Sequence, residues 1–317
     1  MYGGCPERFL LMNLVLFNEH ERLRSGWRAA IFAGAFTFFA TGWAIFGGVI
    51  SSINSLGINR DGLLLWGADI FFSLVLAVVL GWVLGRVLEG LPLKALGWAF
   101  HRGWVRDLSI GLVIGAATLA FACLVCVALG GMSFAPNGSA GSSAIGITLI
   151  ISAVIFILGA AAEEALFRGY LLQTFARENL AWIAIIFTSI FFAVAHLANP
   201  NFSALAMINT LLAGLWFSVA YLKTRSLWLP FGVHFTWNWF QGAIFGIPVS
   251  GITRVTTAPL LQQTDSGPVW LTGGSYGIEG GIVCTIALLL STVLIWFLPV
   301  LKADKEMLEL TSKGNNE

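Results

Sequence analysis

Long apolar runs alternate with short polar segments along the whole chain. Eight of these runs are about as long as the 20 or so residues that a helix needs to cross the hydrocarbon core of a bilayer. We therefore predict an all-α polytopic membrane protein, with one integral membrane domain over residues 1–317. The eight transmembrane helices are expected near residues 29–52, 62–85, 108–129, 145–168, 181–198, 203–222, 228–247 and 279–301.

Composition supports this interpretation. The chain is 57% hydrophobic and only 10% charged, with a mean hydropathy of +0.85, whereas soluble domains carry about 25% charged residues. The alternating apolar and polar pattern of an outer-membrane barrel is absent. The net charge of +1 gives no indication of nucleic-acid binding.

The distribution of basic residues predicts an orientation. Fourteen of the 17 Lys and Arg residues lie in the N-terminal segment, the C-terminal segment, or the turns expected on the same side as both termini. Only Arg60 and Arg254 lie on the opposite side, and Arg168 lies within an apolar run. Because basic residues mark the cytoplasmic side, we predict that both termini are cytoplasmic. The long segment 248–278, on the other side, is expected to fold over one mouth of the bundle.

Ionisable and amide side chains interrupt three of the apolar runs. A charge at the bilayer centre costs about 2.5–3.5 kcal/mol on insertion scales, so these positions suggest function. Asp69 is expected to be an interfacial or capping residue, and Glu279 is left unassigned. Cys123 and Cys126 are expected to serve packing. The candidates for chemistry are Glu163, Glu164, Arg168, His196, His234 and Asn238.

Helical spacing assigns these side chains to faces. Glu164 and Arg168 are four residues apart in the order that favours an ion pair. Glu163 lies about 100° further round the helix, so we expect it to be a desolvated carboxylate without that arginine. At 1.5 Å per residue, Glu163 and His196 each lie about 25 Å from the turn near residue 179, which places them level. A helix over 145–178 would be about 50 Å long, so it must protrude, tilt or break at Gly169.

This set of residues fits the hydrolysis of an acyl bond. Glu163 would act as the general base and later return the proton to the leaving amine. His196 would help to orient the water. His234 and Asn238, four residues apart, would stabilise the developing oxyanion.

The same residues resemble the motifs of the CPBP family of intramembrane proteases, which includes the type II CAAX prenyl endopeptidases and the lysostaphin-resistance A-like proteins. The family's EExxxR motif is matched by Glu163, Glu164 and Arg168, its FxxxH motif by Phe192 and His196, and its HxxxN motif by His234 and Asn238. The resemblance covers about residues 145–247. It implies an eight-helix fold, catalytic roles for Glu163, His196, His234 and Asn238, and supporting roles for Glu164, Arg168 and Phe192.

The resemblance leaves the use of a metal open. Zinc held by Glu163, His196 and His234 is one possibility, but a metal-free mechanism is favoured because the chain has no HExxH motif. The expected partners are the lipid bilayer and a membrane-associated peptide or protein substrate, in the cell membrane of a prokaryote. Two other functions are weighed. One is a non-proteolytic immunity or scaffold protein. The other is a transporter with a proton relay, which the absence of an internal repeat disfavours.

Overall fold

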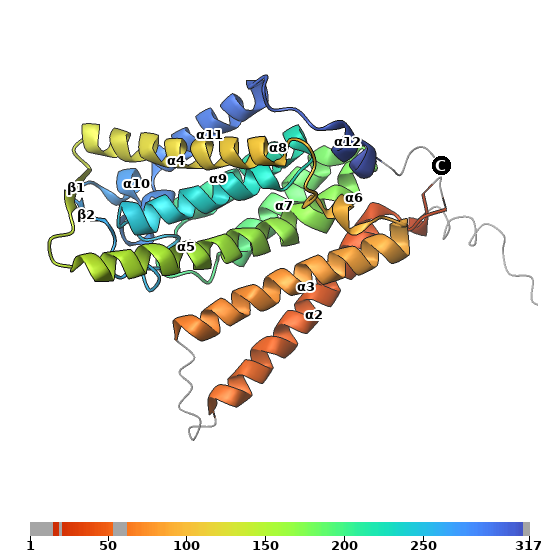
Figure 1. Cartoon of the computed structure of the whole chain (residues 1–317), viewed down its shortest axis with the longest axis horizontal. Coiled ribbons are helices and arrows are strands. Elements are labelled where there is room, and N and C mark those ends of the chain that lie inside the picture. Colours follow the sequence, from red (N-terminus) through yellow and green to blue (C-terminus); the bar gives the residue numbers. More distant parts are fainter. Residues whose placement is uncertain (1–14, 19–20, 53–61, 313–317) are drawn as a thin grey trace, which may run out of the picture.

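Helices make up most of the protein. A computed structural model describes residues 15–18, 21–52 and 62–312, with side chains at 51 and 52 left out (Figure 1). The longer helices are α2 (Ser25–Ser52), α3 (Leu63–Glu89), α4 (Trp104–Ala128), α5 (Ser142–Glu164), α7 (Ala181–Ala195), α8 (Ala204–Thr224), α9 (Trp228–Trp239) and α11 (Ile282–Phe297). The shorter ones are η2 (Leu93–Leu96), η3 (Ala165–Leu171), α6 (Leu172–Ala176), η4 (Phe240–Ile244), α10 (Val269–Thr272), η5 (Gly274–Tyr276), η6 (Ile278–Gly280) and α12 (Lys305–Ser312).

The apolar helices make this an integral membrane protein. Within the described residues, five helical segments are long and apolar enough to cross a membrane: Ser25–Ile50, Leu63–Glu89, Trp104–Ala128, Ser142–Ala176 and Ala204–Thr224. Helices α7 and α11 are apolar but shorter, at 15 and 16 residues, and α9 has only 12 before η4 continues it. Each predicted run thus contains a helix, while the eight-span topology stays a prediction.

The helical bundle carries a small two-stranded sheet at one end, which the hydropathy pattern did not indicate. Strand β1 (Met132–Pro136) pairs antiparallel with β2 (Leu261–Asp265), so that Met132 faces Asp265. Gln262 adds hydrogen bonds to Asn137 and Ser139 across this small sheet. The segment 248–278 therefore folds back onto the bundle, as predicted, and it does so partly as a strand.

Two π-helical segments follow directly after the parts of α5 and α9 that carry predicted site residues. Helix α5 does not break at Gly169, because η3 and α6 continue it to Ala176. Segment η3 adopts the wider π geometry directly after Glu164, and η4 does the same soon after Asn238. Single π turns inside α-helices frequently occur at functional sites.

Close contact between α4 and α9 fixes the position of His234. A Cβ on Gly115 would lie 2.2 Å from the carbonyl oxygen of Val233, and one on Gly111 would lie 2.4 Å from that of Leu229. Glycines four residues apart allow two membrane helices to approach this closely. The Thr236 hydroxyl also donates to the Leu112 carbonyl oxygen across the interface. Helix α9 is therefore held within the core of the bundle.

Helices α2 and α3 are attached to the bundle by ion pairs at one end, and α2 diverges from it toward the other (Figure 1). The start of α3 stays in contact, because Leu63, Trp66 and Ile70 pack against a cluster that contains Ile155 and Phe156 of α5. At the attached end, Glu89 of α3 binds Arg28 of α2 and Arg177 just after α6, and Arg28 also binds Glu178. Helix α12 lies at this same end, where Lys94 binds Glu306. The basic segments that follow α3 and α6 thus share one end of the molecule with α12, opposite the β1–β2 sheet.

Candidate active site

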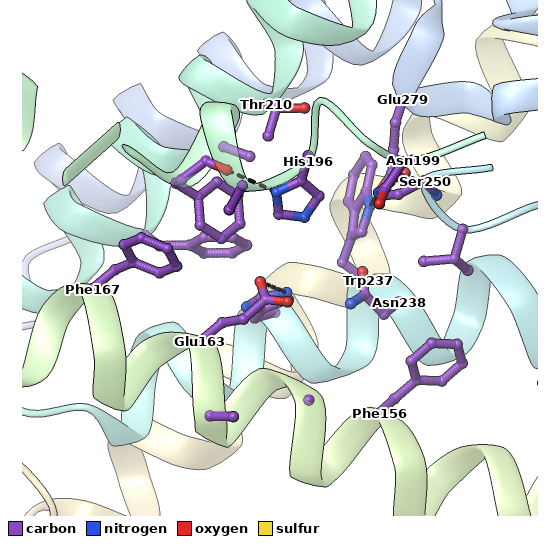
Figure 2. Close-up of a pocket in the computed structure, with 18 of the residues that line it drawn as sticks. Phe156, Glu163, Phe167, His196, Asn199, Thr210, Trp237, Asn238, Ser250 and Glu279 are labelled. Carbon is purple, nitrogen blue, oxygen red and sulfur yellow. Dashed lines mark hydrogen bonds and ion pairs between the residues drawn. The ribbon is translucent and has the colours of Figure 1, made fainter. Parts of the chain in front are cut away.

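A cavity of about 420 Å³ opens between the bundle and α3. Figure 2 shows that side chains from several helices point into it. Its wall includes Glu163 of α5, Phe192 of α7, and His234 and Asn238 of α9, together with His196 just after α7. The structure therefore brings together all four residues for which sequence predicts catalytic roles.

Glu164 is buried behind this wall and holds two partners. Its Oε1 atom accepts hydrogen bonds from Arg168 Nη1 at 3.0 Å and from His234 Nδ1 at 2.9 Å. Both the Glu164 and Arg168 side chains have no exposed surface. The predicted Glu164–Arg168 ion pair is thus present, and its additional contact with His234 joins α5 to α9.

Aromatic rings surround this ion pair. The Arg168 guanidinium lies 4.7 Å from the ring centre of Phe192 and 5.1 Å from that of Phe217, distances at which cation–π attraction is effective. Phe217 also stacks on the His234 ring, with centroids 4.5 Å apart. Phe192, placed by sequence in a supporting role, contacts the rings of both His196 and His234. Phe217 was missed because no motif marks it within its apolar helix.

His234 lies between two glutamates. Because the carboxylate of Glu164 accepts its Nδ1 hydrogen, the neutral imidazole carries a lone pair on Nε2. That nitrogen lies 3.7 Å from Glu163 Oε2, which is beyond direct hydrogen-bond distance. The sequence pattern paired His234 with Asn238 as an oxyanion donor. In this tautomer His234 faces Glu163 as an acceptor, and it donates from Nε2 only when protonated.

Glu163 faces the cavity, as Figure 2 shows. Its side chain keeps 36% of its surface exposed. The expectation of a fully desolvated carboxylate was therefore wrong, because the cavity reaches the side chain. Its Oε2 atom is nevertheless enclosed and has no hydrogen-bond partner in the structure. One oxygen thus points at His234 while the carboxylate as a whole stays accessible.

His196 is fixed by its own helix. Its Nδ1 atom lies 2.7 Å from the carbonyl oxygen of Phe192, and since a carbonyl only accepts, Nδ1 carries the hydrogen. The neutral ring then offers a lone pair on Nε2. Of the two histidines, it is His234 and not His196 that lies within 4 Å of Glu163 in the described structure.

Two acids outside the motifs also line the cavity. Asp69 lies in the second turn of α3, where the Trp43 indole donates to it at 2.7 Å, so it does not cap the helix. Glu279 in η6 accepts hydrogen bonds from the Trp237 indole and from the backbone N–H and hydroxyl of Ser250. The sequence pattern assigned neither acid to the site, because their spacing does not connect them to the motifs.

The residues of the zinc alternative do not fit a three-ligand site in this arrangement. Among the described residues, no three His, Cys, Asp or Glu side chains are placed to hold one metal ion. The mechanism considered below therefore uses no step through a metal.

The cysteines and the core agree with the sequence interpretation. Cys123 and Cys126 are buried without disulfides, in the hydrophobic cluster that also contains Phe192, Phe217 and Trp237. That cluster extends from α4 to α11 and supports the wall of the cavity from behind. The packing role predicted for these two cysteines is confirmed.

Comparison with known proteins identifies the region that carries the site. Residues 145–240 match the family model described as type II CAAX prenyl endopeptidase Rce1-like. This segment includes all seven predicted site residues and supports the resemblance to the CPBP family, a family of proteases.

The curated relatives match over limited stretches. The uncharacterized protein YyaK of Bacillus subtilis (strain 168) is 27% identical over 164 residues, which cover 48% of this chain and 49% of the relative. An uncharacterized 24.3 kDa protein of Escherichia coli is 38% identical over 82 residues, which cover 25% of this chain and 37% of the relative. The chain thus spans half or less of the length of these relatives.

Proposed function

We propose that this protein is an intramembrane endopeptidase that hydrolyses peptide bonds of membrane-associated proteins or peptides with water activated by Glu163. One observation carries the proposal. An accessible carboxylate faces His234 across 3.7 Å inside a cavity, within the segment that matches a protease family model. Glu164 and Arg168 hold the opposite nitrogen of that histidine.

The first step is activation of water. Glu163 Oε2 and His234 Nε2 are both acceptors and lie too far apart to bind each other directly. Because Oε2 is enclosed, the attacking water would bind at the accessible part of the Glu163 carboxylate and direct one hydrogen to it, leaving a lone pair for the scissile carbonyl carbon. Glu163 takes one proton as general base while the oxygen attacks.

The second step is stabilisation and collapse of the tetrahedral intermediate. Asn238 lies one turn after His234 on the cavity wall, and its amide N–H is suited to the developing oxyanion. His234 would add a second donor once protonated. The C–N bond then breaks as the protonated Glu163 gives its proton to the leaving nitrogen. His196 presents Nε2 as an acceptor for the substrate or the water.

The surroundings follow from the predicted topology. We place the protein in the cell membrane of a prokaryote, with both termini in the cytoplasm and the β1–β2 sheet on the other side. Its partners are then lipid and a membrane-associated substrate, without nucleic acid. Enclosing the reaction among apolar helices strengthens the electrostatic interactions on which it depends.

The test uses purified full-length protein in detergent and a quenched fluorescent peptide library. We expect cleavage by the unchanged chain and none by Glu163→Gln, which keeps the shape but cannot take a proton. Glu306→Gln is a matched control, because Glu306 binds Lys94 at the attached end of α3, outside the cavity. Cleavage that survives in Glu163→Gln refutes the mechanism. A folded chain that cleaves no peptide favours the alternative of a non-proteolytic scaffold or immunity protein.

A further inference from the structure

The charges that line the cavity are all of one sign. Three carboxylates lie on its wall, those of Asp69, Glu163 and Glu279, and no lysine or arginine does. Arg168 lies behind Phe192 and Phe217 and already binds Glu164. Among the described residues, His196 and His234 are therefore the only basic side chains on the cavity wall, and no permanently charged cation is there to receive an anionic group.

Glu279 follows the last motif residue, Asn238, by about 40 positions in the sequence, and no lysine or arginine is among its hydrogen-bond partners. It accepts three hydrogen bonds, from Trp237 Nε1 at 3.0 Å, Ser250 N at 2.5 Å and Ser250 Oγ at 2.8 Å. These partners are neutral, so they orient the carboxylate without cancelling its charge.

A buried phenol lies near Glu279. The Tyr276 side chain is 1% exposed and does not itself line the cavity. Ser250, Thr210 and Asn199, which approach its hydroxyl, do line the cavity. Burial, followed by the Glu279 charge, raises the pKa of Tyr276 to about 12, so the phenol keeps its proton and adds no charge beside Glu279.

The edge of the cavity contains one further acid and one nearby cation. Asp69 is exposed there and is hydrogen-bonded to the neutral indole of Trp43. Arg254 lies over the ring of Trp66, 5.2 Å from its centre, and its side chain is exposed. It does not line the cavity, but it is the basic residue that an anionic ligand at the edge would use.

We propose, resting on the endopeptidase function above, that the cavity takes an internal peptide segment bearing a basic side chain and disfavours one ending in a free carboxylate. The acids attract the basic group. A terminal carboxylate entering the same space would face three acids and, among the described residues, no lysine or arginine, and it would lose its hydration. Glu279 is thus a residue that determines specificity.

The experiment measures binding separately from hydrolysis. Fluorescent peptides share one Ala/Leu core and carry a flanking Lys, Gln or Glu with an amidated C-terminus. A further Gln peptide has a free C-terminal acid. Affinity is measured by fluorescence anisotropy with full-length protein carrying Glu163→Gln, so that no probe is consumed. We expect the Lys peptide to bind about tenfold more tightly than the Glu peptide, as expected for one nearby charge at low effective dielectric. The amide should bind more tightly than the acid.

The variants locate the effect. Adding Glu279→Gln or Asp69→Asn should reduce the Lys-to-Glu affinity ratio, and adding Glu306→Gln should leave it unchanged. If Glu279→Gln does not fold, the Asp69→Asn variant still tests the inference. The inference is overturned if the Lys and Glu peptides bind with equal affinity. It is also overturned if the Glu peptide binds more tightly and this preference disappears in Arg254→Gln. Cleavage of the same peptides by the unchanged chain is scored separately, so a failure of the endopeptidase proposal is distinguishable from a failure of this one.

Discussion

Replacing Glu164 by glutamine tests the most enclosed part of the site. Its carboxylate neutralises Arg168 and orders His234 through the same oxygen atom, Oε1. Glutamine has nearly the same shape but no charge. Arg168 would then be a cation with no exposed surface, partnered only by the carbonyl oxygen of Gly214 and by aromatic rings.

The size of the effect follows from this burial. Removing one partner of a buried ion pair costs about 3–5 kcal/mol, because the remaining charge is left without compensation in a medium of low dielectric. Glu164→Gln should therefore lower the free energy of unfolding by about that amount. It should also reduce activity, because the neutral amide oxygen that Arg168 keeps at this position holds the Nδ1 hydrogen of His234 less strongly than a carboxylate oxygen does.

The assay is thermal melting in detergent alongside peptide hydrolysis. The double change Glu164→Gln with Arg168→Gln removes both charges and should recover much of the stability, since no isolated ion remains. Glu163→Gln should melt like the unchanged protein, because the Glu163 side chain is about one-third exposed and pairs with no basic side chain beyond His234. If Glu164→Gln melts normally, or if the double change is no more stable than the single one, the ion pair does not hold this site together.

Three further predictions follow. Asn238→Ala should lower kcat by about 10²–10³-fold with little change in KM. If it mainly raises KM instead, Asn238 does not stabilise the oxyanion. Gly115→Ala should destabilise the protein by at least about 1–3 kcal/mol in a melting assay, since its Cβ would meet the Val233 carbonyl oxygen at 2.2 Å. Gly146→Ala, with open space around it, should not. Reporters fused at residue 317 and within 130–144 should give opposite sides of the membrane, and matching signals would contradict the eight-span topology.

Much of the fold could be predicted because apolar helices of bilayer length leave a strong pattern. Hydropathy located a helix in each of the eight runs. It could not reveal the β1–β2 pairing, because strands of five residues joined across more than 120 positions have no local signature. The π geometry of η3 was also hidden, since Gly169 is compatible with a break or with a wider helical turn. Both features depend on contacts that form only after the helices assemble.

For the site, spacing within one helix was informative and spacing between helices was not. Four-residue separation correctly paired Glu164 with Arg168. Sequence spacing did not show that His234 is the histidine opposite Glu163. That pairing depends on how far α9 is inserted along the bundle, and the close contacts of Gly111 and Gly115 with α9 set this position. Phe217, Tyr276 and Glu279 contribute through tertiary packing, which no periodicity in their own segments indicates.

The two adjacent glutamates differ because the helix places them in different environments. Glu164 points into a closed aromatic shell, where its Oε1 atom binds both Arg168 and His234 and its side chain has no exposed surface to meet substrate or water. Glu163, about 100° away, faces the cavity and contacts no cation other than a histidine that can itself gain or lose a proton. One carboxylate is thereby committed to holding His234 in a defined tautomer, which leaves the other free to exchange protons. A single aspartate or glutamate could not do both, since an acid held by arginine is a poor base, and an accessible one would not keep the imidazole fixed.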